Sequence, residues 1–181
     1  MIVKKIIDPT IFNLKRSISV EVASDMPASR RNSIIKWINK VAFKLDKIAT
    51  KYRLNGITAG QLGINRRIIL CNFINGTQEI IVNPVILQKD PVEESEIEQC
   101  VCFNERYHVK RPKNIKLGYY DDQLRHRTIT FGEVSTRLIL HLIDHLDYKS
   151  ISSVGYTNDD LRKRGEIPIF VDDSWGPVYR A

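Results

Sequence analysis

The chain has 181 residues, of which 43% are hydrophobic, so it is long enough for one domain with a sizeable core and too short for two comfortable ones. Its formal net charge of +7 is compatible with a position near an anionic surface, but the arginines form short, dispersed clusters such as Arg30 with Arg31 and Arg66 with Arg67. Such clusters are usually solvated, and no aromatic-interleaved basic stripe accompanies them, which disfavours a direct nucleic-acid function.

The first predicted element is a long amphipathic helix within residues 26–56. Its apolar residues recur at intervals of three and four, and Asn55 followed by Gly56 is expected to close it. The residues that set this period are Ile34, Ile35, Ile38, Val41, Ala42, Leu45 and Ile48.

Four short β-rich runs follow the helix, and turn signals such as Asn75-Gly76 and Asp121-Asp122 separate them. The runs are residues 66–73, 79–87, 114–121 and 127–131. They predict an antiparallel sheet, which together with the helices indicates an α+β fold.

A second helix is predicted from about Gly132 to Asp147. Its apolar residues surround nearly the whole circumference, so we expect it to be buried. From Gly165 onward, Pro and Gly stand where a helix would fail, so this tail is expected to be extended or a loop. No internal repeat or linker is apparent, and we expect a single domain over residues 1–181.

The second helix carries two histidines, His141 and His145, four residues apart and therefore on one face. Burial of an unpaired imidazole costs roughly 1–3 kcal/mol, so each ring needs a backbone carbonyl, a carboxylate or a metal as partner. A thiolate plus two imidazoles is a common metal-ligand set, and Cys100 is the third candidate. On spacing alone, Cys102 competes for that role.

The cysteines and the hydropathy also bear on location. Cys71, Cys100 and Cys102 do not make a disulfide framework, which indicates a reducing, cytoplasmic compartment. No stretch of about 18 apolar residues and no signal-peptide pattern occurs, so we expect no membrane association through a spanning helix.

Three ordered blocks resemble motifs of the peptide deformylase family. The stretch "GITAGQLG" (56–63) is similar to G-L-A-A-P-Q-V-G, "EQCVC" (98–102) to E-G-C-L-S, and "HLIDHLDY" (141–148) to H-E-x-D-H-L-x-G. The resemblance extends to about residue 150, and the tail diverges from about residue 152. It implies a peptide deformylase-like α+β fold, in which a long N-terminal helix and antiparallel sheets surround a central buried metal-binding helix.

The resemblance also implies roles for individual residues. Cys100, His141 and His145 would bind one divalent metal ion, Fe(II) or Zn(II), with Ni(II) also accepted. Water activated by the metal would attack the formyl carbon of an N-formylmethionyl peptide, while the Gln61 amide and the Val101 backbone N–H stabilise the oxyanion.

The resemblance also implies residues that contact the substrate and residues that stabilise the site. Gly56, Ile57 and Arg106 would contact the substrate. Glu98 and Arg111 would form a structural ion pair, although a surface pair of little worth is the alternative. Between Cys100 and His141 the chain is about one residue short, which we assign to a loop at "FNERYH" (103–108).

The main departure from the family pattern is Leu142, which replaces the glutamate that serves as general base. Leucine cannot transfer a proton, and Asp144, about 200° further round the helix, is expected to point away. We therefore favour a monomeric, metal-binding protein that binds formylated peptide N-termini, or a related small ligand, with weak or absent deformylase activity.

Two alternatives remain open. One is an active deformylase that uses another proton route, with Glu98 or Glu105 as the remaining carboxylates. The other is a non-catalytic binding module for nascent chains or the ribosome.

Overall fold

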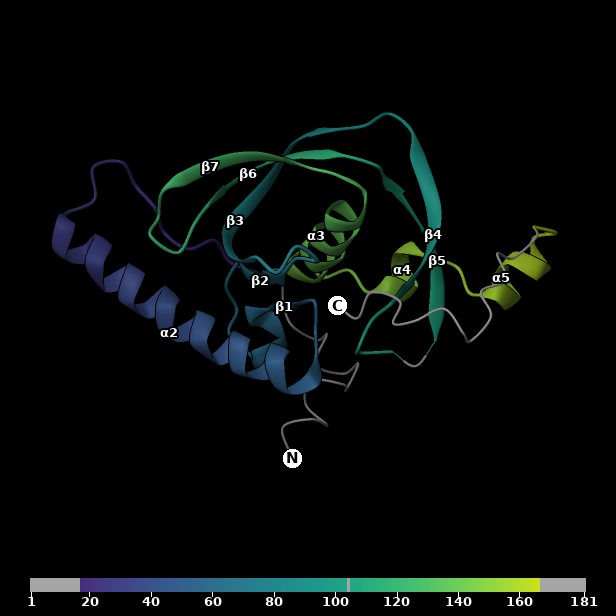
Figure 1. Ribbon diagram of the computed structural model, residues 1–181, viewed down its shortest axis with the longest axis horizontal. Helices are drawn as coiled ribbons and strands as arrows, with labels where there is room; N and C mark the ends of the chain where they lie inside the picture. The colour runs from purple at the N-terminus through teal and green to yellow at the C-terminus, as the bar shows by residue number, and fades with distance from the viewer. Residues whose placement is uncertain (1–16, 104, 167–181) are drawn as a thin grey trace.

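The computed structural model describes residues 17–103 and 105–166, which form two antiparallel sheets with helices packed around them (Figure 1). Helix α2 (Ala28–Tyr52) runs along one side of the molecule, and α3 (Glu133–Leu146) lies in the middle. The other elements are β1 (Gly56–Thr58), the 3-10 helix η2 (Ala59–Leu62), β2 (Ile68–Asn72), β3 (Gln78–Lys89), β4 (Glu93–Gln99), β5 (Arg106–Pro112), β6 (Ile115–Tyr120), β7 (His126–Phe131), α4 (Ile151–Val154) and α5 (Asn158–Lys163).

The larger sheet has five strands in the order β1-β2-β3-β6-β7, and every neighbouring pair is antiparallel. Four of these strands coincide with the four β-rich runs of the sequence, so that prediction is confirmed. Strand β1 was not predicted, because three residues are too few to show a pattern. It forms one edge of the sheet and pairs with β2 through Gly56 and Cys71.

The second sheet is a hairpin of β4 and β5 that the sequence pattern did not predict. Four of the seven β4 residues are glutamates, and β5 carries buried His108 and Arg111, so neither strand shows an apolar alternation. The expected loop at residues 103–108 is therefore partly wrong, because β5 begins at Arg106.

Helix α2 confirms the predicted amphipathic helix but ends earlier than expected. Its inward residues are Ile38, Val41, Leu45 and Ala49. Arg53 adopts a left-handed conformation with φ 53° and ends the helix. Gly56, expected to close the helix, begins β1 instead, where a Cβ atom would lie only 2.4 Å from the Leu142 side chain of α3.

Helix α3 is buried, as its apolar circumference predicts, and packs against β1, β2 and β5. Its Leu138, Ile139, Leu142, Ile143 and Leu146 join the core formed with β2, β3 and β6. The β4–β5 hairpin lies along another face of α3 and contacts it from Arg137 to Asp144, so α3 meets polar groups of the hairpin as well as the apolar core.

The segment after α3 attaches to the hairpin. Backbone hydrogen bonds of 2.7 and 3.1 Å join His108 and Tyr156, and His108 Nε2 lies 2.6 Å from Asn158 Oδ1. Residues 167–181, which contain most of the tail predicted to be extended, lie outside the described residues. Within residues 17–103 and 105–166, no helix is long and apolar enough to cross a membrane.

Candidate metal centre

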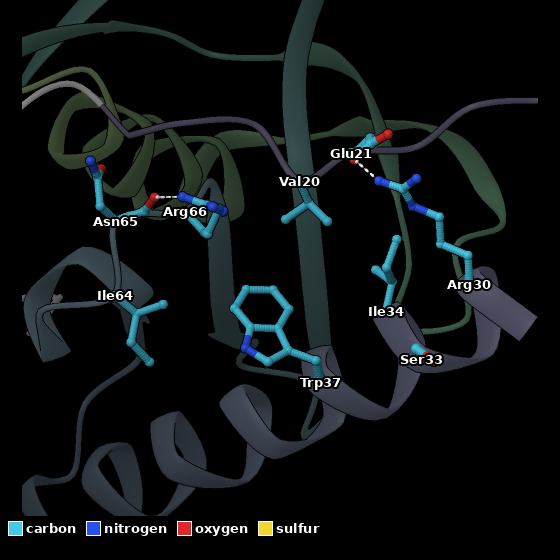
Figure 2. Close-up of a pocket in the computed structure, with 9 residues that line it drawn as sticks. All are labelled: Val20, Glu21, Arg30, Ser33, Ile34, Trp37, Ile64, Asn65 and Arg66. Carbon is cyan, nitrogen blue, oxygen red and sulfur yellow. Dashed lines mark hydrogen bonds and ion pairs between the residues drawn. The ribbon is translucent and has the colours of Figure 1, made fainter. Parts of the chain in front are cut away.

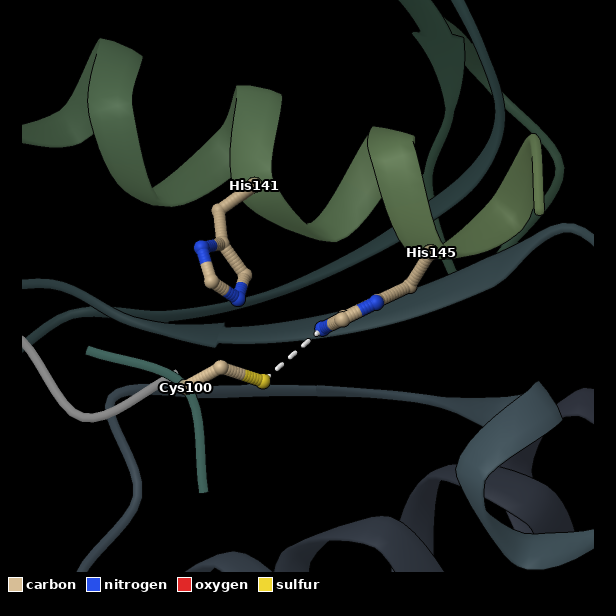
Figure 3. Close-up of side chains that lie close together, drawn as sticks. All are labelled: Cys100, His141 and His145. Atoms are coloured by element: carbon tan, nitrogen blue, oxygen red, sulfur yellow. Dashed lines mark hydrogen bonds between the residues drawn. The ribbon is translucent and has the colours of Figure 1, made fainter. Parts of the chain in front are cut away.

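Helix α3 and the turn after β4 together bring three candidate ligands to one point (Figure 3). His141 and His145 project from one face of α3, with ring centroids 4.8 Å apart and ring planes at 84°. Cys100 directly follows β4, and its Sγ lies 3.3 Å from His145 Nε2. The ligand atoms of all three residues lie within 4.8 Å of one another.

The environment of these atoms fits a divalent cation. His141 Nε2 is buried and has no hydrogen-bond partner among the residues that the structure describes. Such an atom costs about 1–3 kcal/mol unless something satisfies it. One thiolate with two imidazoles is a ligand set that zinc and similar metals take in catalytic sites, where a fourth position stays open. The three residues could therefore hold one metal ion.

The surroundings of His145 and Cys100 shift the pKa values of both side chains. Burial, followed by the neighbouring His141, holds the pKa of His145 well below its usual range, so its ring is neutral and has a lone pair. A hydrogen bond with Cys102 and burial raise the pKa of the Cys100 thiol well above its usual range. A bound cation deprotonates a coordinating thiol, so metal binding would release a proton from Cys100.

Glu98 orients the first histidine. Its Oε2 lies 3.1 Å from His141 Nδ1. Burial acts against the charge of Glu98, but hydrogen bonds from His141 and Arg111 outweigh it and lower the pKa of Glu98 to about 2. Because an ionised carboxylate only accepts, His141 donates from Nδ1 and directs the lone pair of Nε2 at Cys100 and His145.

Two arginines hold Glu98 in turn. The structure brings the predicted pair together, with Arg111 Nε and Nη2 at 3.0 and 3.1 Å from the two Glu98 oxygens. Arg111 Nη1 also lies 2.6 Å from Asp144 Oδ2. This ion pair holds the Asp144 carboxylate on the hairpin side of α3, away from Leu142. Both partners of the pair are buried, so the alternative of a weak surface pair does not apply.

The second arginine, Arg137, was not identified from the sequence. It lies four residues before His141, on the same face of α3, and its Nη1 is 3.2 Å from Glu98 Oε1. Its other contacts are with Glu96 at 2.8 Å and with the backbone carbonyls of Val109 and Glu94. The signal available in the sequence was the spacing, because Arg137, His141 and His145 follow one another at intervals of four residues.

Replacement of Arg137 should weaken metal binding through Glu98. In Arg137→Met, we expect the Kd for Co(II) to rise by about 10-fold, the lower end of the range for partners of ligating residues. Competition against a chelator, read by thiolate-to-Co(II) absorbance, measures it. Arg162→Met, an exposed arginine on α5, is the matched control and should leave the Kd unchanged. A lower melting temperature with an unchanged Kd would mean that Arg137 is only structural.

Gln61 lies at the edge of the centre, on η2. Its Oε1 accepts from the backbone N–H of Thr58 at 2.8 Å, and its amide nitrogen lies on the other side, 3.7 Å from the buried Cys102 Sγ. Val101 stands between Cys100 and Cys102 in the turn after β4, and the Cys102 N–H lies 3.5 Å from Cys100 Sγ. The Gln61 amide and this turn therefore meet beside Cys100.

Leu142 occupies an apolar position beside this polar centre. Its side chain is 0% exposed, belongs to the core cluster of α3 and contacts the Cα side of Gly56. Among the residues described, the group of potential metal ligands contains no carboxylate. The position after His141 therefore supplies packing and no proton acceptor.

The three residues predicted to contact the substrate differ in burial and in distance along the chain from the metal centre. Gly56 packs on α3, whereas the Ile57 side chain is buried in the core beneath α2, so only the backbone of Ile57 can meet a ligand. Arg106 is exposed at the start of β5. The exposed Glu105, considered as a remote base, lies beside it on the surface.

Comparisons with known proteins agree with this geometry. Residues 9–153 match the family described as polypeptide deformylase. The chain is 34% identical over 129 residues to peptide deformylase of Thermosynechococcus vestitus, with 66% of each chain covered. It is 33% identical over 107 residues to that of Thermoanaerobacter pseudethanolicus, covering 57% of this chain and 66% of that one. The matches thus span slightly less than two thirds of these relatives.

Solved structures show the same fold. A Plasmodium falciparum peptide deformylase in complex with an inhibitor superimposes with a TM-score of 0.69 at 24% identity, covering 87% of this chain and 92% of that one. A peptide deformylase from Synechococcus elongatus in complex with actinonin gives a TM-score of 0.66 at 20% identity, with 88% and 84% covered.

Proposed function

Because the chain belongs to the polypeptide deformylase family, we propose that it binds formylated peptide N-termini at a Cys100/His141/His145 metal centre and hydrolyses them weakly or not at all. The observation that carries the proposal is the fully buried Leu142 beside His141, in a site that otherwise has ligands, orienting carboxylate and amide donor in place.

The metal, two hydrogen-bond donors and strand β1 would each bind a different part of the peptide. When bound, a divalent ion supplies Lewis-acid chemistry, which lowers the pKa of water and polarises a carbonyl group. Gln61 would donate its amide N–H to the formyl oxygen, since its own oxygen is engaged by Thr58. The Val101 N–H would be a second donor. Among the described residues, β1 pairs with a strand on one side only, and its other edge would pair with the peptide backbone.

Proton transfer is the step that this set of residues lacks. A positioned general base typically contributes about 10²- to 10⁴-fold in rate. Glu98 accepts hydrogen bonds from Arg111, Arg137 and His141, and Asp144 is paired with Arg111. Either carboxylate would have to leave its partners before it could act as a base, which argues against rescue by another proton route.

Ligand binding tests this proposal separately from turnover. We expect Co(II)-loaded protein to bind formyl-Met-Ala-Ser at least about tenfold more tightly than Met-Ala-Ser, because the Gln61 and Val101 donors recognise the formyl oxygen. Isothermal titration measures both affinities, and actinonin, carried by the Synechococcus elongatus structure, is a positive control. Removal of the metal should abolish the preference. Equal affinities with and without metal would instead favour a binding module that does not use the centre.

A further inference from the structure

The solvent-facing side of α2 carries a single file of lysines. The five residues are Lys36, Lys40, Lys44, Lys47 and Lys51, and all of them are exposed. At about 100° per residue they fall within a sector of about 80°, opposite the buried face of the helix. At about 1.5 Å per residue the file is about 22 Å long. This corrects the expectation that the basic residues form only dispersed clusters.

Within residues 17–103 and 105–166, no acidic side chain neutralises the positive charge of this lysine file. Among the described residues, none of the five lysines has a carboxylate partner. Asp46, the sole acidic residue of α2, accepts a hydrogen bond of 2.8 Å from the Gln78 amide. Lysines four residues apart repel one another, and a polyanion laid along the file removes that repulsion. Phe43, 60% exposed, lies under Lys47 at 4.5 Å and adds an aromatic surface beside the file.

A hollow of about 470 Å³ adjoins the file on one side (Figure 2). Figure 2 shows the Trp37 ring rising from α2 toward the segment that carries Ile64 and Arg66. Trp37 is 37% exposed, and an ion pair of 2.6 Å between Arg30 and Glu21 stands at the rim. The volume falls within the range of small-molecule pockets, and an aromatic wall next to cationic groups suits a flat heteroaromatic ring.

We propose that this face of α2 binds single-stranded RNA, with phosphates along the lysine file and one unpaired base against Trp37. Single-stranded nucleic acid binding combines a positive track for the backbone with aromatic side chains on which bases stack. A base paired in a duplex could not enter the hollow. A membrane surface fits less well, because a membrane-bound helix inserts its apolar face, whereas that face of α2 is buried. The inference concerns a partner at a site separate from the metal centre.

Fluorescence anisotropy with a labelled 12-nucleotide oligouridylate tests the lysine file. Five phosphate contacts predict a slope of log K against log salt of about −3.5 for a single strand. The triple variant Lys36→Gln/Lys40→Gln/Lys44→Gln should lose at least about tenfold in affinity, and its slope should become shallower by about 2. The matched control removes the same charge from exposed strand positions, as Lys89→Gln/Lys110→Gln/Lys116→Gln, and should remain within about twofold of the parent. Equal losses in both variants would overturn the proposal.

The hollow is tested with Trp37→Ala, which should weaken oligouridylate binding by about tenfold, while Trp37→Phe keeps most of the affinity. Binding to a duplex RNA of equal length should not change in either variant. The proposal is also overturned if phosphatidylserine vesicles bind through the lysine file and oligouridylate does not. Cys100→Ser should bind RNA like the parent, so failure of this proposal and failure of the metal centre give different results.

Discussion

Leu142→Glu is expected to raise the rate of formate release from formyl-Met-Ala-Ser by about 100-fold or more in the Fe(II)-loaded protein. The substitution places a carboxylate next to His141, on the face that meets Gly56, and under the proposed function it supplies the proton acceptor that the leucine cannot provide. Burial of the carboxylate at this fully enclosed position raises its pKa, which makes it a better base. Anaerobic steady-state kinetics with formate detection measures the gain.

Leu142→Gln is the matched control for this variant, because it has the size and polarity of glutamate but cannot accept the proton. It should show no gain over the parent. Equal gains in both variants would mean that a polar side chain, and not a base, limits the reaction. No gain in Leu142→Glu, with metal content and melting temperature unchanged, would show that the lost glutamate is not what limits turnover.

Cys100→Ser should reduce bound metal from about one equivalent to less than about one tenth of an equivalent after gel filtration. Loss of the thiolate removes one of three ligands and leaves His141 Nε2 and His145 with an oxygen donor that binds such metals less strongly. Elemental analysis of protein reconstituted under anaerobic conditions gives the stoichiometry. The melting temperature of the parent should rise on metal addition, since the ion binds only the folded protein.

Cys102→Ser is the control for ligand choice, because Cys102 was the competing thiol on spacing alone. It should retain a full equivalent of metal, since His141, His145 and Cys100 form the close group and Cys102 does not belong to it. Metal loss in Cys102→Ser with retention in Cys100→Ser would show that the ligand assignment is wrong.

The elements that could be predicted from the sequence are those with an apolar period. Helix α2, helix α3 and four strands of the large sheet follow regular apolar spacing, so their positions were predictable. The β4–β5 hairpin was not, because its inward residues include Glu98 and Arg111, which are buried only as partners of α3. Burial of charged residues through tertiary ion pairs cannot be predicted from the hydropathy of the local sequence.

Part of the candidate site could likewise be predicted from the sequence, and part could not. The His141/His145 spacing indicated a shared helix face, with Cys100 or Cys102 as a third ligand. Resemblance to family motifs favoured Cys100 and added Gln61, but only the fold shows that Arg137 contacts Glu98. The lysine file is not apparent as a run of adjacent charges, because its members are three and four residues apart in the sequence. Helical projection makes them neighbours, so that signal lay in the sequence once the helix was placed.

The rate of formate release by the unaltered, Fe(II)-loaded protein at saturating formyl-Met-Ala-Ser tests the central claim most directly. Metal content and peptide binding must be measured on the same preparation. The account predicts about one equivalent of metal, bound peptide and a rate at least about 100-fold below that of Leu142→Glu. A rate equal to that of the variant would contradict it and would place the proton acceptor on another residue.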